Sequence, residues 1–167
     1  MEQAEAAKEV LGSSDDIRAF IVDRGAAPQF FSLRVQLPSQ GRTDSKLAAT
    51  DKMWALIKTY ASGGENELHA HPNEDHLFIV VQGVARFYGP KNEEWDVGKN
   101  NGVLLPRGCF YWFKVVSSEP LVMVRVGCVA NSGSDPAHRI DIHGKEMDGY
   151  STENKYGTVV MSNRYFE

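Results

Sequence analysis

The sequence contains little cysteine and no long apolar run. Only two of its 167 residues are cysteines, Cys109 and Cys128, too few for the disulfide framework of a small secreted domain. The longest apolar runs are about five residues, whereas a membrane-spanning helix needs about 20. The first ten residues, MEQAEAAKEV, lack the hydrophobic core of a signal peptide. We therefore expect free thiols, no membrane partner and a location in the reducing cytoplasm.

The sequence also lacks an excess of positive charge. The formal net charge is −4 and the pI is about 5.7, and the basic residues do not form a stripe along any predicted helix. Domains that bind DNA or RNA carry a clustered basic footprint, so we expect no nucleic-acid partner. No internal repeat and no alternation of strands with helices occurs, which excludes solenoids and parallel α/β folds.

The chain does contain a series of short segments with the composition of β-strands. Each is rich in aromatic and branched residues, and turns rich in Gly, Pro, Asn or Lys separate most of them. Short strands at this spacing predict an all-β sandwich or barrel. The expected strands are residues 30–37, 52–61, 67–71, 76–82, 84–89, 102–106, 109–116 and 121–129.

The two ends of the chain have a different composition. Residues 2–11 are rich in Ala, Glu and Lys and favour a helix, and Ser13 or Ser14 can cap a second short helix that follows. We expect a single domain over residues 1–167. Its parts are a helical extension that packs as a lid (residues 1–27), a β-barrel (28–130) and a C-terminal arm (131–167). Residues 159–166, with Tyr165 and Phe166 near the end, form either a last strand or an extended arm.

Three of the five histidines fall within eight positions: His69, His71 and His76. Side chains at i and i+2 on a strand point to the same face, so His69 and His71 would lie side by side. Pro72 interrupts strand pairing, and residues 73–75 favour a turn. His76 then opens the next apolar run, so a hairpin would bring it beside the other two. The spacing predicts a metal site.

The stretch from Gly63 to Gly83, GGENELHAHPNEDHLFIVVQG, resembles the first motif of the cupins, G-x5-H-x-H-x(3,4)-E-x6-G. Gly63, His69, His71 and Gly83 fall on the pattern. His76 takes the place of the motif's glutamate, which is a departure from the family. The resemblance implies a cupin-type double-stranded β-helix, or jelly-roll barrel, that binds one divalent metal ion.

Residues 106–108 supply the P-x-G of the second cupin motif, G-x5-P-x-G-x2-H-x3-N, but Tyr111 stands where that motif has its histidine. If Tyr111 points into the barrel, strand alternation also aims Cys109 and Phe113 inward, while Phe110, Trp112 and Lys114 face outward. An inward Lys114 would carry a desolvation cost, which supports this assignment. Tyr111 is then a phenolate ligand, a general acid or an aromatic wall.

The resemblance implies that His69, His71 and His76 hold the metal. Asp75 is the alternative ligand, because the motif also allows three spacer residues. Imidazole suits Fe(II), Zn and Ni, whereas carboxylate suits harder ions. Neutral ligands leave the charge of the metal uncompensated, so we expect an anionic substrate. Fe(II) is the preferred ion, with Zn or Ni as the other candidates.

Cupins with three histidines at the metal include dioxygenases, so the resemblance implies an Fe(II) dioxygenase for a small anionic organic compound. Phe78, Val80, Cys109 and Phe113 would line its pocket.

Two alternatives stay open. One is a lyase, isomerase or cyclase in which the metal is a Lewis acid and Tyr111 moves a proton. The other is a cupin that binds a small metabolite without catalysis. Cupins are commonly dimers, so a homodimer is expected.

The remaining polar residues near these motifs are assigned less specific roles. Arg34, Arg86 and Arg125 lie in strand-like segments, and one that faced inward would bind a carboxylate. Glu65, Glu67 and Glu74 are expected on a solvated rim. His138 and His143 lie in the polar C-terminal part and are expected at the surface.

Overall fold

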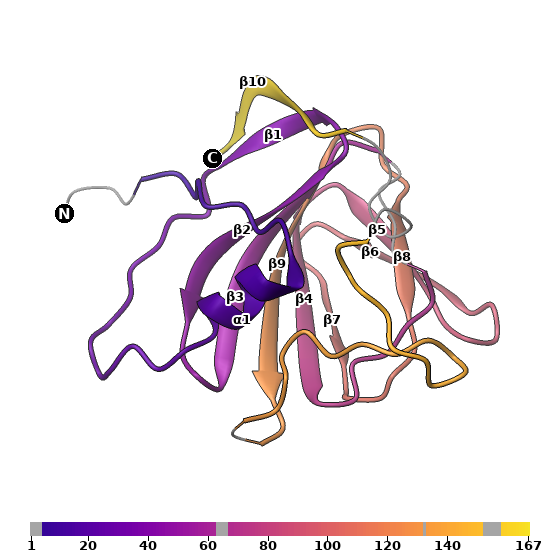
Figure 1. The fold of residues 1–167 in the computed structure, drawn as a ribbon. Helices are drawn as coiled ribbons and strands as arrows, with labels where there is room; N and C mark the ends of the chain where they lie inside the picture. Colours follow the sequence, from indigo (N-terminus) through magenta and orange to yellow (C-terminus); the bar gives the residue numbers. More distant parts are fainter. Residues whose placement is uncertain (1–4, 63–66, 132, 152–157) are drawn as a thin grey trace.

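The computed structural model describes residues 5–62, 67–131, 133–151 and 158–167. Within these ranges the chain forms one helix and ten strands (Figure 1), and all paired strands run antiparallel. No helix in this part of the chain is long and apolar enough to cross a membrane. The elements are β1 (Val35–Gln40), β2 (Arg42–Ala49), β3 (Met53–Tyr60), β4 (Glu74–Gln82), β5 (Val84–Tyr88), β6 (Glu94–Gly98), β7 (Gly102–Leu105), β8 (Trp112–Val115), β9 (Leu121–Val129), β10 (Val160–Phe166) and α1 (Ser14–Phe20).

Two sheets face each other and enclose an aromatic core. One has the strand order β2-β3-β9-β4-β7 and the other the order β6-β5-β8. Phe78 of the first sheet packs against Phe87 and Phe113 of the second, with ring centroids 5.6 and 5.7 Å apart. Burial of such rings contributes about 1.5–3 kcal/mol each. This arrangement is the jelly-roll barrel that the sequence predicts.

Strand alternation aims one set of side chains from the larger sheet into the barrel. The register of β3, β9 and β4 places Trp54 opposite Gly127, and Gly127 opposite His76. Because Gly127 has no side chain, the Trp54 and His76 rings meet across it, with centroids 5.6 Å apart. Arg125, two residues before Gly127, faces inward in the next row, opposite Phe78. One end of the barrel interior is therefore polar.

Residues 5–11 do not form the expected helix; residues 1–4 lie outside the described ranges. The segment runs extended beside the first strands, where Ala7 N donates to Arg34 O over 2.9 Å and Leu11 N donates to Asp44 O over 2.8 Å. Backbone partners at the sheet edge thus outweigh helix propensity, which is a weak preference. The helix capped by Ser13 is confirmed, and its Oγ accepts from Asp16 N over 3.1 Å.

Two strands occur where no strand was expected. The sequence of residues 38–45, PSQGRTDS, predicts a turn-rich loop, but residues 42–49 form β2, and β6 was missed entirely. The polar side chains of β2 have partners inside the fold: the Thr43 and Thr59 hydroxyls lie 2.7 Å apart, and Asp44 pairs with Lys58. Burial with a partner makes polar residues compatible with a central sheet.

Strand β1 begins at Val35, later than the predicted start at residue 30, and its partner is β10 near the C-terminus of the chain. The two form a separate ribbon at the top of Figure 1. Residues 159–166 thus contribute a last strand within the chain. Phe166 packs against the small apolar cluster around Val35.

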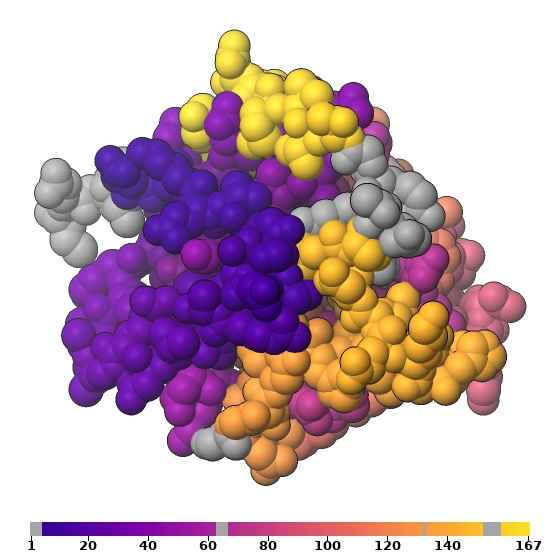
Figure 2. Space-filling view, viewed as in Figure 1, coloured from indigo at the N-terminus to yellow at the C-terminus, as the bar shows by residue number. Residues whose placement is uncertain are grey.

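Helix α1 and the C-terminal segment 133–151 cover the polar end of the barrel. They lie side by side on the face shown in Figure 2. Arg18 binds Asp135 through two hydrogen bonds of 3.0 and 2.8 Å, and Ser14 Oγ donates to Asp148 Oδ1 over 2.9 Å. The predicted lid therefore consists of one helix together with a segment more than a hundred residues later in the sequence.

Replacement of Gly127 by alanine should destabilise the protein. An added Cβ would lie 2.2 Å from two atoms of the Trp54 indole, so the ring must leave its position over β9. We expect Gly127→Ala to lower the free energy of unfolding by about 1–3 kcal/mol, measured by urea denaturation. Gly98→Ala is the matched control in β6, because there the nearest atom lies 3.9 Å away. Equal effects of the two substitutions would contradict this packing.

Candidate metal centre

The histidine segment is held in place by the turn and strand that follow β7. His69 and Tyr111 form an isolated β-bridge with hydrogen bonds of 3.1 and 2.9 Å. Gly108 N donates to His71 O over 2.9 Å. The P-R-G turn at residues 106–108 and Tyr111 therefore fix the backbone of both histidines, while strand β4 carries His76.

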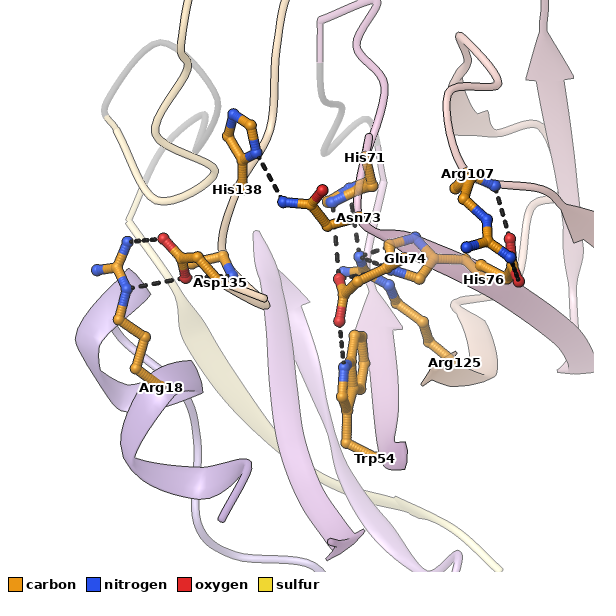
Figure 3. A network of polar contacts seen from close by, with 12 residues as sticks. Arg18, Trp54, His71, Asn73, Glu74, His76, Arg107, Arg125, Asp135 and His138 are labelled. Atoms are coloured by element: carbon orange, nitrogen blue, oxygen red, sulfur yellow. Dashed lines mark hydrogen bonds and ion pairs between the residues drawn. The ribbon is translucent and has the colours of Figure 1, made fainter. Parts of the chain in front are cut away.

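Three buried side chains converge on one point: His71, Glu74 and His76. One ligand atom of each lies within 4.8 Å of those of the other two, and the His71 and His76 ring centroids are 4.2 Å apart. Glu74 Oε2 lies 3.0 Å from His76 Nε2. Trp54 Nε1 donates to the other Glu74 oxygen over 2.7 Å (Figure 3).

The position of Glu74 corrects a prediction. Glu74 was expected on a solvated rim, yet it is only 1% exposed. Strand β4 begins at Glu74 itself, two residues before His76, so alternation places both side chains on the inner face. Glu67 remains at the surface, and Glu65, like Gly63, lies outside the described residues.

His69 lies beside this group. Its ring centroid is 5.1 Å from that of His71 and 4.6 Å from that of Tyr111. Its Nδ1 is 2.7 Å from Glu67 O, which directs Nε2 inward. Nε2 is buried and has no hydrogen-bond partner among the described residues, and the same is true of His71 Nδ1. The structure thus groups His71 and His76 with Glu74 and places His69 next to them.

Asp75, the alternative ligand, points to the opposite face of β4. Its Oδ1 accepts from Arg107 N over 2.8 Å, and its side chain is partly exposed. The structure does not bring it to the three histidines. Near the C-terminal cover, His143 is exposed, but His138 is partly buried and its Nδ1 lies 3.0 Å from Asn73 Nδ2.

Of the three arginines considered from the sequence, Arg125 alone faces the histidines. Its Nη2 lies 3.4 Å from His71 Nε2 and 3.2 Å from His76 Nδ1, and its guanidinium stacks on Trp54 at 4.9 Å. Arg86 is instead paired with Asp96 on the outside of the barrel, and Arg34 with Glu167.

Comparisons with known proteins agree with this architecture. Residues 56–127 match the family model of the cupin domain. The chain contains a cupin domain. The Schizosaccharomyces pombe Cnp3 cupin domain is 16% identical and aligns with 55% of this chain and 67% of its own, with a TM-score of 0.50. A conserved protein of unknown function from Streptococcus pyogenes is 15% identical over 65% of this chain and 93% of its own, also with a TM-score of 0.50. Identities this low show the fold alone. No curated protein matches this cupin.

Burial sets the protonation of the groups in this cupin's site. It lowers the pKa of all three imidazoles well below the ordinary value for histidine, so they are neutral and each has one nitrogen able to act as a metal ligand. Burial also raises the pKa of Glu74 to about 7, although the hydrogen bond from Trp54 opposes the shift. The site therefore offers neutral nitrogens and one carboxyl group.

The side chains fit a divalent ion. Three neutral imidazoles and one carboxylate are ligands that Fe(II), Zn and Ni accept, and two of the buried nitrogens have no other partner in the described structure. Cupins usually carry three histidines and a glutamate, and Glu74 restores that composition from a different place in the sequence. Arg125 would compete with such an ion, because a guanidinium N–H and a metal ion both bind the nitrogen lone pairs of His71 and His76.

The predicted apolar pocket is divided in two by the structure. Phe78, Val80 and Phe113 lie fully inside the core. Cys109 lies at its edge and, with Tyr111, lines an apolar cavity of about 510 Å³ between the open edges of the sheets. Tyr111 thus stands between this cavity and the histidines.

Glu74 and Asp75 offer a matched test of the metal centre. We expect Glu74→Gln to weaken binding of Fe(II) or Zn at least about 10- to 100-fold, whether Glu74 is a ligand or orients His76. Asp75→Asn should leave metal affinity unchanged, since that carboxylate faces Arg107. Metal titration of the demetallated proteins measures both. Loss of affinity in Asp75→Asn with none in Glu74→Gln would contradict this geometry.

Proposed function

We propose that this cupin is a metal-dependent enzyme, an Fe(II) dioxygenase that acts on a small anionic organic substrate. The observation that supports it most is the buried group of His71, Glu74 and His76. Two histidines and one carboxylate are the facial ligand set of non-haem Fe(II) oxygenases. We propose His71 and His76 as ligands together with His69, as the sequence motif predicts, and with Glu74 added.

Iron bound there would supply the site for O₂ and substrate activation, while the surrounding residues prepare it. Trp54 fixes one Glu74 oxygen by its N–H and leaves the other toward His76. Helix α1 and the C-terminal segment exclude water from this end of the barrel, which strengthens every charge interaction within it.

Tyr111 supports a second candidate, a metal-dependent lyase, isomerase or cyclase. Its side chain is 4% exposed, and burial raises its pKa, so the hydroxyl keeps its proton at neutral pH. A protonated phenol 4.6 Å from His69, measured between ring centroids, is suited to donate a proton or a hydrogen bond to a substrate. We propose this role for Tyr111 in either reaction class.

Tyr111→Phe tests the role of the hydroxyl. Packing should survive, so we expect the metal content to stay the same and turnover to fall by roughly 10²–10⁴-fold. Metal analysis of protein purified without a histidine tag, followed by O₂ uptake on a panel of small anionic substrates, measures both. Product formation without O₂ uptake would favour the lyase class.

Two controls accompany this experiment. Tyr88→Phe removes a phenol hydroxyl from a ring stacked on Trp112, away from the histidines, and should leave turnover unchanged. His71→Ala should lose the metal, since a ligand is removed. Unchanged turnover in Tyr111→Phe would remove Tyr111 from the reaction, and an unchanged metal content in His71→Ala would refute the proposed centre.

We also propose that this cupin is a homodimer. Large apolar side chains are exposed near the N-terminal segment and on β10: Phe30 is 84% exposed, Phe31 47% and Met161 40%. A stable interface buries at least about 1,000 Å² in total. Light scattering at micromolar concentration should give the mass of a dimer, and Phe30→Glu should reduce it. Trp95→Glu is the control and should leave the mass unchanged, because Trp95 is 55% exposed on β6, away from these residues. A monomeric wild-type chain would contradict the proposal.

A cytoplasmic location also remains a proposal. Its support is that both cysteines, Cys109 and Cys128, are free thiols in the structure. Free thiols are the usual state of cysteine in a reducing compartment.

A further inference from the structure

A small cavity lies beside His71, beneath α1 and the C-terminal segment. Its volume is about 30 Å³. Ser14 and Ile17 close it from the helix side, and Pro136 and Ala137 close it from the C-terminal side. The charged side chains that line it are Arg42, Asp44, Lys58, Arg125 and Arg139, all less than 9% exposed.

The charges of these lining residues do not balance. Four are cationic and one, Asp44, is anionic. Lys58 pairs with Asp44. Burial opposes ionisation of Asp44, but the attraction of Lys58 and Arg42 outweighs it and lowers the pKa of Asp44. Glu74, next to the cavity, adds at most one further negative charge. Arg42 has partners of its own, Tyr60 and Gly149 among them. Buried charges are normally paired, but no carboxylate among the described residues forms an ion pair with Arg125 or Arg139.

Arg139 shows the imbalance most clearly. It is 5% exposed, and its guanidinium makes no hydrogen bond or ion pair with any residue in the described ranges. Its Nη1 is buried without a partner, as is Arg125 Nε. The backbone at Arg139 is held in place because Met147 N donates to the Arg139 carbonyl over 3.0 Å. The guanidinium packs closely against Gly149, where an added Cβ would lie 2.7 Å from Nη1.

A carboxylate matches both the charge and the size of this cavity. The planar guanidinium presents parallel N–H donors that suit two carboxylate oxygens. A water-sized group needs some 10–15 Å³ of cavity, so about 30 Å³ accommodates two such atoms. A wider outer cavity of about 410 Å³ shares Ser14, Ala137 and Arg139 with it. Arg139 thus lines both cavities, and the outer one is also lined by acidic residues, Asp15, Asp135, Glu146 and Asp148.

We propose that this cavity binds a carboxylate group of the substrate, between Arg139 and Arg125 and next to His71. This inference rests on the proposed function in one respect: the rest of the substrate is placed at the proposed metal ligands. The substrate class is then a small carboxylic acid, held by its carboxylate while its reactive part faces His71 and His76. Binding of the carboxylate itself requires no metal.

Malonate, with neutral malonamide as the matched compound, tests this site in metal-free protein. We expect malonate to bind in isothermal titration calorimetry and malonamide not to bind. Charge-assisted hydrogen bonds contribute about 1.5–3 kcal/mol, so Arg139→Gln should weaken malonate binding at least about 10-fold. Arg107→Gln removes the same charge from an exposed arginine at Asp75 and should leave affinity unchanged.

Thermal stability distinguishes a ligand-binding arginine from a structural one. Because Arg139 has no partner in the described protein, Arg139→Gln should keep or raise the Tm of the metal-free protein while malonate binding is lost. Arg139→Lys keeps the charge without the planar fork and should bind malonate more weakly than wild type. It also serves as the test if Arg139→Gln does not fold.

Several results would overturn the carboxylate site. These are absence of malonate binding to the wild type, equal binding of malonamide, or affinity that is unchanged in both Arg139→Gln and Arg139→Lys. The proposed function fails separately. Malonate binding without metal-dependent O₂ uptake leaves the carboxylate site in place, whereas O₂ uptake without malonate binding removes only that site.

Discussion

The polar interior of this cupin depends on the hydrogen bond from the Trp54 indole to Glu74. Gly127 leaves room for the ring to pass over β9, and the ring then reaches β4. The same indole stacks against Arg125 and meets the edge of the His76 ring. One aromatic side chain thus fixes a carboxylate, a guanidinium and an imidazole that would otherwise be buried with few constraints. A buried carboxylate without a hydrogen-bond partner would lower the free energy of unfolding by several kcal/mol.

The barrel is divided along its axis into two chemically different halves. At one end, Phe78, Phe87 and Phe113 form an aromatic core that accounts for much of the apolar burial. At the other, arginine, lysine and histidine side chains occupy the space between the sheets. The first half supplies stability, and the second carries charges that reduce it. Natural proteins retain such costly groups mainly at functional sites.

Much of the fold and part of the site could be predicted from the sequence, because both depend on local periodicity. Alternation placed Tyr111 on the inner face, and spacing identified His71 and His76. The same rule, applied from His76 back to Glu74, would have found the buried carboxylate had Asn73–Asp75 not resembled a turn. Lys58 alternates with Trp54, Leu56 and Tyr60, which was an unused sign of a buried cation. Arg139 carries no local signal, since only the path of the C-terminal segment brings it to the barrel.

Strand β2 and the N-terminal segment were mispredicted for a related reason. Their polar composition resembles that of a loop or helix when each is considered alone. Thr43 and Asp44 become suitable for a central strand only through their partners on β3, Thr59 and Lys58. Long-range pairing of this kind cannot be read from composition, because it depends on which strands become neighbours.

The cover formed by α1 and the C-terminal segment has a consequence for the order of events during synthesis. Strands β2 to β9 emerge from the ribosome before residues 133–151, and β10 emerges later still. Helix α1 must therefore wait for its partners Asp135 and Asp148. Until they arrive, the polar end of the barrel lacks this cover, so its charged side chains stay in contact with water. Desolvation of these charges is therefore a late step in the folding of this chain.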